Sequence, residues 1–309
     1  MTIKTKDHID YFGAICLIAF SVLLGINHVV IKVVNTGLQP VFFCGLRSLL
    51  AALCIVAWMK YKKLPIVFPR SDWKIGILAG TIFAAEFLCL FLALDYTTVI
   101  RNAIIYYSMP LWLSILAHFL LPNEKMTRTK LLGLGLAFSG VVWAISSKDD
   151  SVGVYTLFGD LCALGGAIGW AGIILLARGS SFSQIRPEMQ LLWMTLVSAP
   201  MLIIASLFFG ELVRDFQYMH IFGLLFQSIV VVAIGFIFWL WLLSIYPASG
   251  VASFAFLTPI FGMAFGWLIL SESLSNNIAI SACLVIIGIF LINRPNKIPL
   301  HKTKTGYAP

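Results

Sequence analysis

Polar and ionisable side chains interrupt apolar stretches in the first third of the sequence, at His28, Arg47, Glu86, Arg101 and Asn102. An arginine at the centre of a bilayer costs about 2.5–3.5 kcal/mol even on insertion-based scales, so such a group faces a polar partner or a wet cavity. A carboxylate in the same setting can neutralise a cation, hold a substrate ammonium group or carry a proton. These residue types therefore indicate a site for a small polar molecule, and the apolar stretches around them must position it.

The stretches around these side chains are long enough to cross a membrane. The chain has 309 residues, of which 60% are hydrophobic and 11% are charged, whereas soluble domains have about 25% charged residues. A helix needs about 20 apolar residues to span the hydrocarbon core. The sequence therefore predicts an all-α polytopic membrane protein with ten transmembrane helices, at 11–34, 41–59, 74–94, 98–121, 129–146, 154–177, 187–210, 220–244, 248–270 and 276–292.

The lysines and arginines predict how these helices lie in the membrane. Most of them fall on the side that holds the N-terminus, whereas the helix ends on the other side carry only Lys32, Arg101, Lys148 and Arg214. Because cytoplasmic loops carry the excess of positive charge, we expect both terminal segments, 1–10 and 294–309, in the cytoplasm. The net charge of +8 thus reports topology and gives no reason to expect nucleic-acid binding.

The second half of the sequence repeats features of the first. The segments 94–145 and 244–292 each contain a tyrosine, a proline, a glutamate and a glycine in the same order, namely Tyr96, Pro110, Glu124 and Gly140 against Tyr246, Pro259, Glu272 and Gly288. We therefore expect two repeats, 11–147 and 154–293, with five helices each. An odd number of helices inverts the second repeat in the membrane, and inverted repeats are typical of secondary transporters.

The stretch 25–53 carries a spaced set of residues, Gly25, Asn27, Lys32, Pro40 and Arg47. It resembles the first signature of EamA-type transporters in the drug/metabolite transporter superfamily. The tryptophan that is usual in this signature is Leu24 here, whereas Trp170 holds the corresponding place in the second repeat. The resemblance implies ten helices in two inverted five-helix repeats around a central cavity for a small metabolite.

The ionisable groups share a depth in the predicted membrane. At 1.5 Å per residue, Arg47, Glu86 and Arg101 fall about 5–15 Å below the outer surface. We expect Arg101 to face an outward-opening central cavity with Glu86 as its partner, and the alternative is that Arg101 reaches the headgroups. Ion pairing, substrate contact and proton coupling are the candidate roles of Glu86. A structural or gating role is favoured for Arg47 and an interfacial one for Lys32, and Asp160 is a second candidate partner for these cations.

Aromatic residues complete the predicted cavity lining. Two aromatic pairs, one ahead of each proline of the repeat, are expected to meet across the pseudo-two-fold axis: Tyr106 with Tyr107, and Phe254 with Phe256. The candidate substrate-binding residues are therefore Arg101, Asn102, Glu86, Arg47, Tyr106, Tyr107, Trp170, Phe254, Phe256 and His28. Each of the two prolines removes a backbone hydrogen bond and is expected to bend its helix. The repeated glutamates, Glu124 and Glu272, are expected to cap the helices that follow them.

Motifs of other function classes are absent from the sequence. It contains no GxxxxGK[ST] loop for nucleoside triphosphates, no HExxH motif and no CxxC pair, so we expect neither a cofactor nor a metal. Two glycine-rich segments, 133–140 and 165–172, lie in apolar helices and are expected to be helix-packing surfaces. A membrane-embedded enzyme or a lipid-handling protein would need clustered catalytic groups, which the sequence does not contain.

The favoured function is that of a secondary transporter in a bacterial inner membrane. It is expected to export a small polar metabolite, an amino acid or a related compound, by alternating access between the repeats. The alternatives are an importer or exchanger of a nucleotide-like or other anionic metabolite and, in another class, a structural or receptor protein without flux. A proton gradient and exchange are the two candidate modes of energy coupling.

Overall fold

The computed structural model describes residues 6, 9–120, 127–147, 156–246, 254 and 257–293. Over these residues the chain is helical almost throughout, and the β-type pairing is an isolated antiparallel bridge between Leu38 and Val213. Within this described part, eight helical segments are long and apolar enough to cross a membrane, and two shorter apolar helices accompany them. The prediction of an all-α polytopic membrane protein is confirmed.

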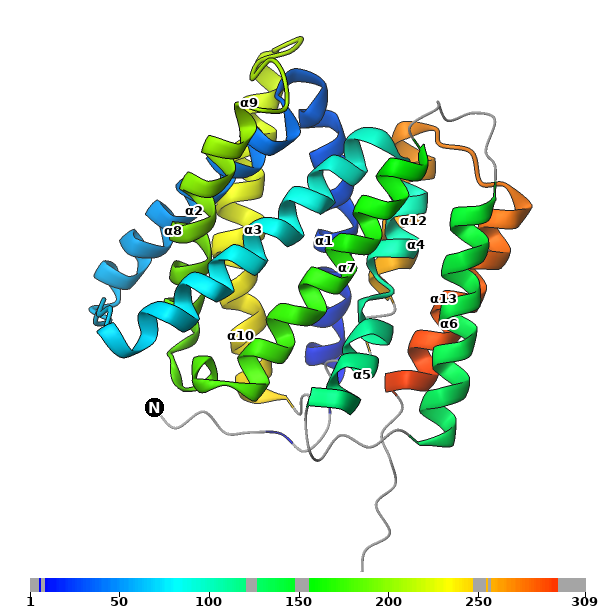
Figure 1. The fold of residues 1–309 in the computed structure, drawn as a ribbon, viewed down its shortest axis with the longest axis horizontal. Helices are drawn as coiled ribbons and strands as arrows, with labels where there is room; N and C mark the ends of the chain where they lie inside the picture. Colours follow the sequence, from blue (N-terminus) through cyan, green and yellow to red (C-terminus); the bar gives the residue numbers. More distant parts are fainter. Residues whose placement is uncertain are drawn as a thin grey trace, which may run out of the picture.

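The helices form one bundle, coloured along the chain in Figure 1. Their bounds in chain order are α1 (Tyr11–Gly37), α2 (Pro40–Tyr61), α3 (Trp73–Tyr96), α4 (Val99–Tyr106), α5 (Met109–Leu120), α6 (Arg128–Ser146), α7 (Thr156–Gly179), α8 (Pro187–Ser206), α9 (Tyr218–Leu225), α10 (Phe236–Ile245), α12 (Leu257–Leu270) and α13 (Asn276–Asn293). Short 3-10 helices, Arg70–Asp72 and Ser181–Gln184, precede α3 and α8, and a π-helical stretch, Phe226–Gly235, joins α9 to α10.

Local sequence signals set where several helices begin. Asp10 caps α1 by accepting a hydrogen bond from a first-turn backbone N–H at 2.8 Å. Thr98 caps α4 in the same way, at 3.1 Å. Pro40 and Pro187 are the first residues of α2 and α8. The backbone N–H at this position has no partner within a helix, so a proline there costs no hydrogen bond.

The predicted helix 98–121 is divided into two. α4 and α5 lie on either side of a turn at Tyr107 and Ser108. Pro110 stands in the first turn of α5, where its ring removes the N–H that would continue the hydrogen-bond series of α4. The expected bend at this proline is therefore confirmed. Pro259 lies in the first turn of α12, and most residues just before that helix fall outside the described part of the chain.

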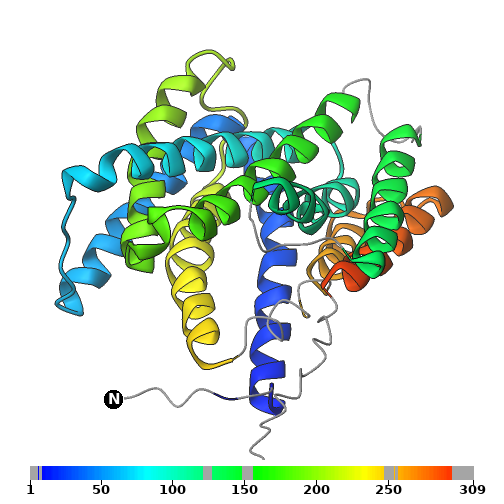
Figure 2. The same ribbon diagram turned by 60° about the horizontal axis from the view of Figure 1, so that its bottom comes forward.

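Helices from the two halves of the chain pack in pairs. α6 lies along α13 at one side of the bundle, and α2 lies along α8 at the other side (Figures 1 and 2). Between them α3 packs on α7, and α1 packs on α12. A Cβ atom added at Gly288 of α13 would lie 2.6 Å from the backbone nitrogen of Ala137 in α6. The glycine-rich segment 133–140 is thus part of a helix-packing surface, as predicted.

The two halves are inverted relative to each other. Near the C-terminal end of α1, Lys32 donates a hydrogen bond to the carbonyl of Thr97, and the Thr97 hydroxyl donates one to Asp160 near the N-terminal end of α7. The first helices of the two halves therefore run in opposite directions. We call the end of the bundle with Lys32, Thr97 and Asp160 the upper end, as Figure 1 draws it, and the end where α1 begins the lower end.

Candidate functional site

Four ring side chains from three helices meet inside the bundle. His28 of α1 stacks on Tyr107, which follows α4, with ring centroids 5.1 Å apart and planes at 13°. Trp170 of α7 stacks on Tyr106 with centroids 5.3 Å apart and meets Tyr107 edge-on at 6.0 Å. His28 and Tyr106 meet edge-on at 5.6 Å. The structure thus brings together four of the predicted site residues, and we call this group the aromatic cluster.

The aromatic cluster borders a buried carboxylate, that of Glu86 in α3, whose residue is 3% exposed. The Tyr106 hydroxyl donates a hydrogen bond to Glu86 Oε1 at 2.8 Å. α7 approaches this carboxylate closely because glycines face it: a Cβ atom at Gly169 would lie 3.0 Å from Glu86 Cβ, and one at Gly166 would lie 3.0 Å from the Tyr106 ring. This glycine-rich segment packs as the sequence predicts and places Trp170 beside the site.

Buried amide side chains adjoin the aromatic cluster. Asn102 Nδ2 lies 3.1 Å from His28 Nδ1, and Gln227 donates hydrogen bonds to the side-chain and backbone oxygens of Asn27. Gln227 belongs to the π-helical stretch, a deformation that is frequent at functional sites. Asn102 Oδ1 and Gln227 Oε1 are buried without a hydrogen-bond partner among the described residues. Gln227 is not among the residues predicted for the site, although a lone amide in an apolar run is a usable signal.

Arg47 of α2 also lies close to Glu86. Its side chain is 1% exposed, and its guanidinium carbon lies over the ring of Phe87, 3.9 Å from the centroid, and 5.0 Å from that of Phe91. Phe87 follows Glu86 directly in α3, and Phe87 and Phe91 belong to the packed group that also contains Tyr106, the hydrogen-bond partner of Glu86. Of the two arginines predicted to share a depth with Glu86, this one therefore packs against the stretch of α3 that carries Glu86.

Arg101 lies apart from Glu86, against Asp160 of α7. Its Nε atom lies 3.2 Å from each carboxylate oxygen of Asp160, and its Nη2 atom contacts the same carboxylate. Nη1 donates to the carbonyl of Ser147 at 3.0 Å, and Nη2 donates to that of Ala144 at 2.7 Å. All three guanidinium nitrogens thus contact protein atoms. The expectation that Arg101 faces a central cavity is therefore wrong.

The predicted pairing of Arg101 with Glu86 is wrong for a geometric reason. The start of α4 faces the start of α7 at the upper end, whereas Glu86 lies about three helical turns below the end of α3. Asp160, the second candidate partner, is the residue that α7 carries to Arg101.

Glu272 caps a helix of the other half of the chain. Its Oε1 atom accepts a hydrogen bond from Val99 N at 2.7 Å, and its Oε2 atom accepts one from Ile100 N at 2.9 Å. The expectation that it caps the following helix is therefore corrected. The loop between α12 and α13 carries Glu272 to the start of α4, while Ser275 caps α13 by accepting from Ile278 N at 3.4 Å.

A pocket of about 610 Å³ opens at the upper end, between the ends of α1 and α3, the start of α4 and the loop after α12. Its lining includes Lys32, Thr98 and Glu272. Lys32 follows His28 by one helical turn, and Thr98 precedes Asn102 by one turn. The pocket is therefore about one helical turn above His28 and Asn102.

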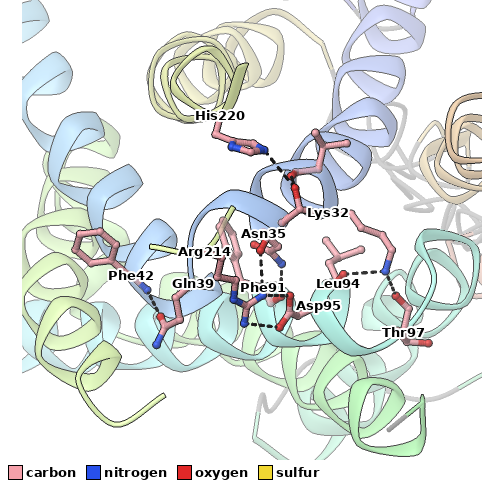
Figure 3. A network of polar contacts seen from close by, with 12 residues as sticks. Lys32, Asn35, Gln39, Phe42, Phe91, Leu94, Asp95, Thr97, Arg214 and His220 are labelled. Carbon is pink, nitrogen blue, oxygen red and sulfur yellow. Dashed lines mark hydrogen bonds and ion pairs between the residues drawn. The ribbon is translucent and has the colours of Figure 1, made fainter. Parts of the chain in front are cut away.

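A polar network lies at the upper end beside this pocket, and Figure 3 shows its contacts. Lys32 donates hydrogen bonds to the carbonyls of Leu94 and Thr97 at 3.1 and 2.6 Å. Its ammonium group therefore binds backbone carbonyls of the protein, whereas an interfacial role was expected. Arg214, in the loop before α9, forms a bidentate ion pair with Asp95 at 2.8 and 3.0 Å. Hydrogen bonding to Asp95 raises the pKa of Arg214. This ion pair was not predicted, because its two residues are 119 positions apart in the sequence.

Phe254 lies away from the aromatic cluster. It packs against a group at the lower end made of Cys16, Leu17, Leu242 and Tyr246. The expectation that it meets Tyr106 and Tyr107 is wrong, because the structure places Phe254 beside the lower parts of α1 and α10. Phe256, the fourth member of that predicted group, and Glu124 lie outside the described residues.

Both halves of the chain match one family of membrane proteins. The sequence model of the EamA-like transporter family matches residues 11–146 and again residues 157–294. The chain belongs to the EamA-like transporter family. This confirms the resemblance drawn from the signature around Pro40 and Arg47, and the family name indicates transporters rather than enzymes.

Relatives with transporter names extend over most of the chain. The uncharacterized transporter YoaV of Bacillus subtilis is 27% identical over 89% of this chain and 94% of its own length. The probable amino-acid metabolite efflux pump of Escherichia coli is 26% identical over 87% of this chain and 91% of its own. A solved crystal structure shares the fold, with a TM-score of 0.62 and 18% identity over 89% of this chain and 94% of that one. The protein is thus a multi-pass transporter of this family.

Proposed function

We propose that this EamA-like transporter exports a small polar metabolite, an amino acid or a related compound, by alternating access. The observation that carries the proposal is the buried meeting of Glu86 with the aromatic cluster, between helices of both halves. Transporters with inverted repeats bind their substrates between the repeats, near the middle of the membrane. The name of the Escherichia coli relative supports both the substrate class and the direction.

The chemistry of the site favours a substrate that carries an ammonium group. Glu86 supplies a buried carboxyl group that can accept hydrogen bonds from an ammonium group, and Tyr106 orients it through the hydrogen bond of 2.8 Å. The faces of Tyr106 and Trp170 attract a cation placed within about 6 Å of a ring centroid. Asn102 and His28 add hydrogen-bonding groups on the adjacent wall.

Alternating access requires the polar links between the halves to open in turn. The links at the upper end are those of Glu272 to the start of α4, Arg101 to Asp160, and Arg214 to Asp95. At the lower end, the Tyr246 hydroxyl donates to Asp10 at 2.7 Å. Rocking of one half against the other would break the upper links and expose the aromatic cluster through the upper pocket.

The charge distribution supports an outward-facing upper end in a bacterial inner membrane. The last turn of α2 and the segment that leads from it to α3 carry Lys60, Lys62, Lys63 and Arg70 at the lower end, and such excess positive charge stays on the cytoplasmic side. Bacterial relatives with transporter names agree with this location. Both termini would then be cytoplasmic.

Untargeted metabolite profiling tests the proposed export. Medium and cells are compared without the protein, with the wild type, with Glu86→Gln and with Glu211→Gln, a matched change at an exposed loop position. We expect compounds enriched in the medium by the wild type and by Glu211→Gln, but not by Glu86→Gln.

Other outcomes of the same experiment decide between the alternatives. Enrichment inside the cells would assign uptake and favour an importer of an anionic metabolite. No difference between the wild type and empty cells, with the protein present in the membrane, would contradict transport of any compound in the profile. Repeating the assay with the proton gradient dissipated separates proton coupling from exchange.

A further inference from the structure

Arg47 is a buried cation whose hydrogen-bonding edge is free. Its Nε and Nη2 atoms are buried without a hydrogen-bond partner among the described residues. We propose that this edge binds the carboxylate group of the transported substrate, so that the site takes a zwitterion with its ammonium group at Glu86. The proposal rests on the export function proposed above and names the chemical class of its substrate.

Arg101 shows what this edge binds when a carboxylate is within reach. Its Nε and Nη2 atoms, the same two atoms, clasp both oxygens of Asp160. The planar guanidinium fork matches a carboxylate with two parallel N–H···O bonds. Two arginines in one bundle thus present the same edge, one filled by a protein carboxylate and one left open.

Among the described residues, the side chain of Arg47 is held in place by packing. Its guanidinium lies over Phe87, the residue directly after Glu86, and beside Phe91, and Phe91 is braced edge-on by Phe43 with centroids 4.9 Å apart. Ring stacking occupies the faces of the guanidinium and leaves its N–H edge available. A buried guanidinium without a paired anion is strongly unfavourable, so this arrangement favours the reversible binding of an anionic ligand.

The neighbouring charge favours a zwitterion over a simple anion. Arg47 packs over Phe87, the residue directly after Glu86, yet in the described part of the chain Arg47 and Glu86 form no ion pair, and the Glu86 carboxyl group accepts a hydrogen bond from Tyr106. A guanidinium and a carboxyl group that lie near each other without pairing can each receive one end of one small molecule. An amino acid carries both groups, and the aromatic cluster can contact its remaining atoms.

Binding to the purified full-length protein tests this assignment. The twenty standard amino acids are screened in detergent for ligands that raise the unfolding temperature, and the best ligand is compared with its carboxamide, which keeps the ammonium group and lacks the carboxylate. In the wild type we expect the amide to bind about 10- to 100-fold more weakly, the factor for losing a charge-assisted bidentate bond. The same preference is expected in Arg70→Gln, the matched change at an exposed arginine.

Two variants of Arg47 make the prediction specific. Arg47→Gln is expected to bind the acid and the amide alike, while Arg47→Lys, which keeps the charge without the fork, is expected to show an intermediate preference. A role of Arg47 in packing alone would lower the unfolding temperature of both variants and leave the preference unchanged. That result would overturn the assignment.

The failure of this assignment is distinguishable from the failure of export. If profiling shows export of a compound without a carboxylate and no amino acid binds, Arg47 is not a carboxylate site although transport stands. If profiling shows no flux, the proposed function itself fails. Equal binding of acid and amide by the wild type also overturns the assignment.

Discussion

The guanidinium of Arg101 clasps the carboxylate of Asp160 with both side chains buried, and this ion pair joins the two halves of the transporter at the upper end. The Thr97 hydroxyl donates to the same carboxylate at 2.9 Å. Arg101 therefore fastens the start of α4 to the start of α7. Its position in an apolar segment is explained by a protein partner and does not require a ligand.

Removing one member of this pair should leave the other as an unpaired buried charge. We expect Arg101→Met and Asp160→Leu each to lower the free energy of unfolding by about 3–5 kcal/mol. The double variant Arg101→Met/Asp160→Leu should recover much of that loss, because no charge is left buried. Unfolding of the purified proteins measures this, and strictly additive losses in the double variant would contradict the pairing.

Glu272 should stabilise the upper end by capping α4. Glu272→Gln removes the charge that two backbone N–H groups share, and we expect a loss of about 0.5–2 kcal/mol in the free energy of unfolding. Glu211→Gln, in an exposed loop, is the control and should change the stability little. Equal stabilities of the two variants would show that the cap contributes nothing.

The two tyrosines of the aromatic cluster should differ in their effect on transport. The Tyr106 hydroxyl bonds Glu86 at 2.8 Å, whereas that of Tyr107 lies 3.4 Å from His28 Nε2 and 3.5 Å from the carbonyl of Leu24. A bond to a charged group contributes about 1.5–3 kcal/mol, so Tyr106→Phe should weaken the apparent substrate affinity by about tenfold or more. Tyr107→Phe, which removes the same atom, should change it by less than about threefold. Initial export rates across substrate concentrations provide the comparison.

Two glycines of the pair formed by α6 and α13 should respond oppositely to alanine. At Gly288 a new Cβ atom would lie 2.6 Å from backbone atoms of α6, whereas at Gly135 it would meet nothing within 4 Å. Gly288→Ala should therefore lower the free energy of unfolding by about 1–3 kcal/mol. Gly135→Ala should raise it by about 0.5–1 kcal/mol, because alanine loses less backbone entropy in a helix. A Gly288→Ala protein as stable as the wild type would contradict this packing.

The proposed orientation predicts which loops face the outside of the cell. A membrane-impermeant thiol reagent should label Glu211→Cys in intact cells and label Lys62→Cys only after the membrane is opened. The six native cysteines all lie within helices. Labelling of the wild-type protein measures their contribution, which is subtracted from that of each variant. The reverse labelling pattern would place the lower end outside.

The number and course of the helices followed from the sequence alone. A bilayer obliges the backbone to satisfy its hydrogen bonds within each segment, so long apolar runs were sufficient to predict the helices. Pro110 predicted a bend in the segment 98–121, but its division into α4 and α5 was seen only in the structure. The repeated tyrosine, proline, glutamate and glycine likewise indicated two related halves. These properties depend on the segments themselves and not on their neighbours.

Only the tertiary structure decided which polar groups meet. Arg101 pairs with Asp160 and not with Glu86, and Glu272 caps α4 and not α13. Which side chains meet depends on how each helix is rotated about its axis and on the angle at which it crosses its neighbours. Those variables are set by side-chain packing, as where Gly169 lets α7 approach Glu86. The residue types needed for a polar site are written in the sequence, but their distances exist only once the two inverted halves are packed together.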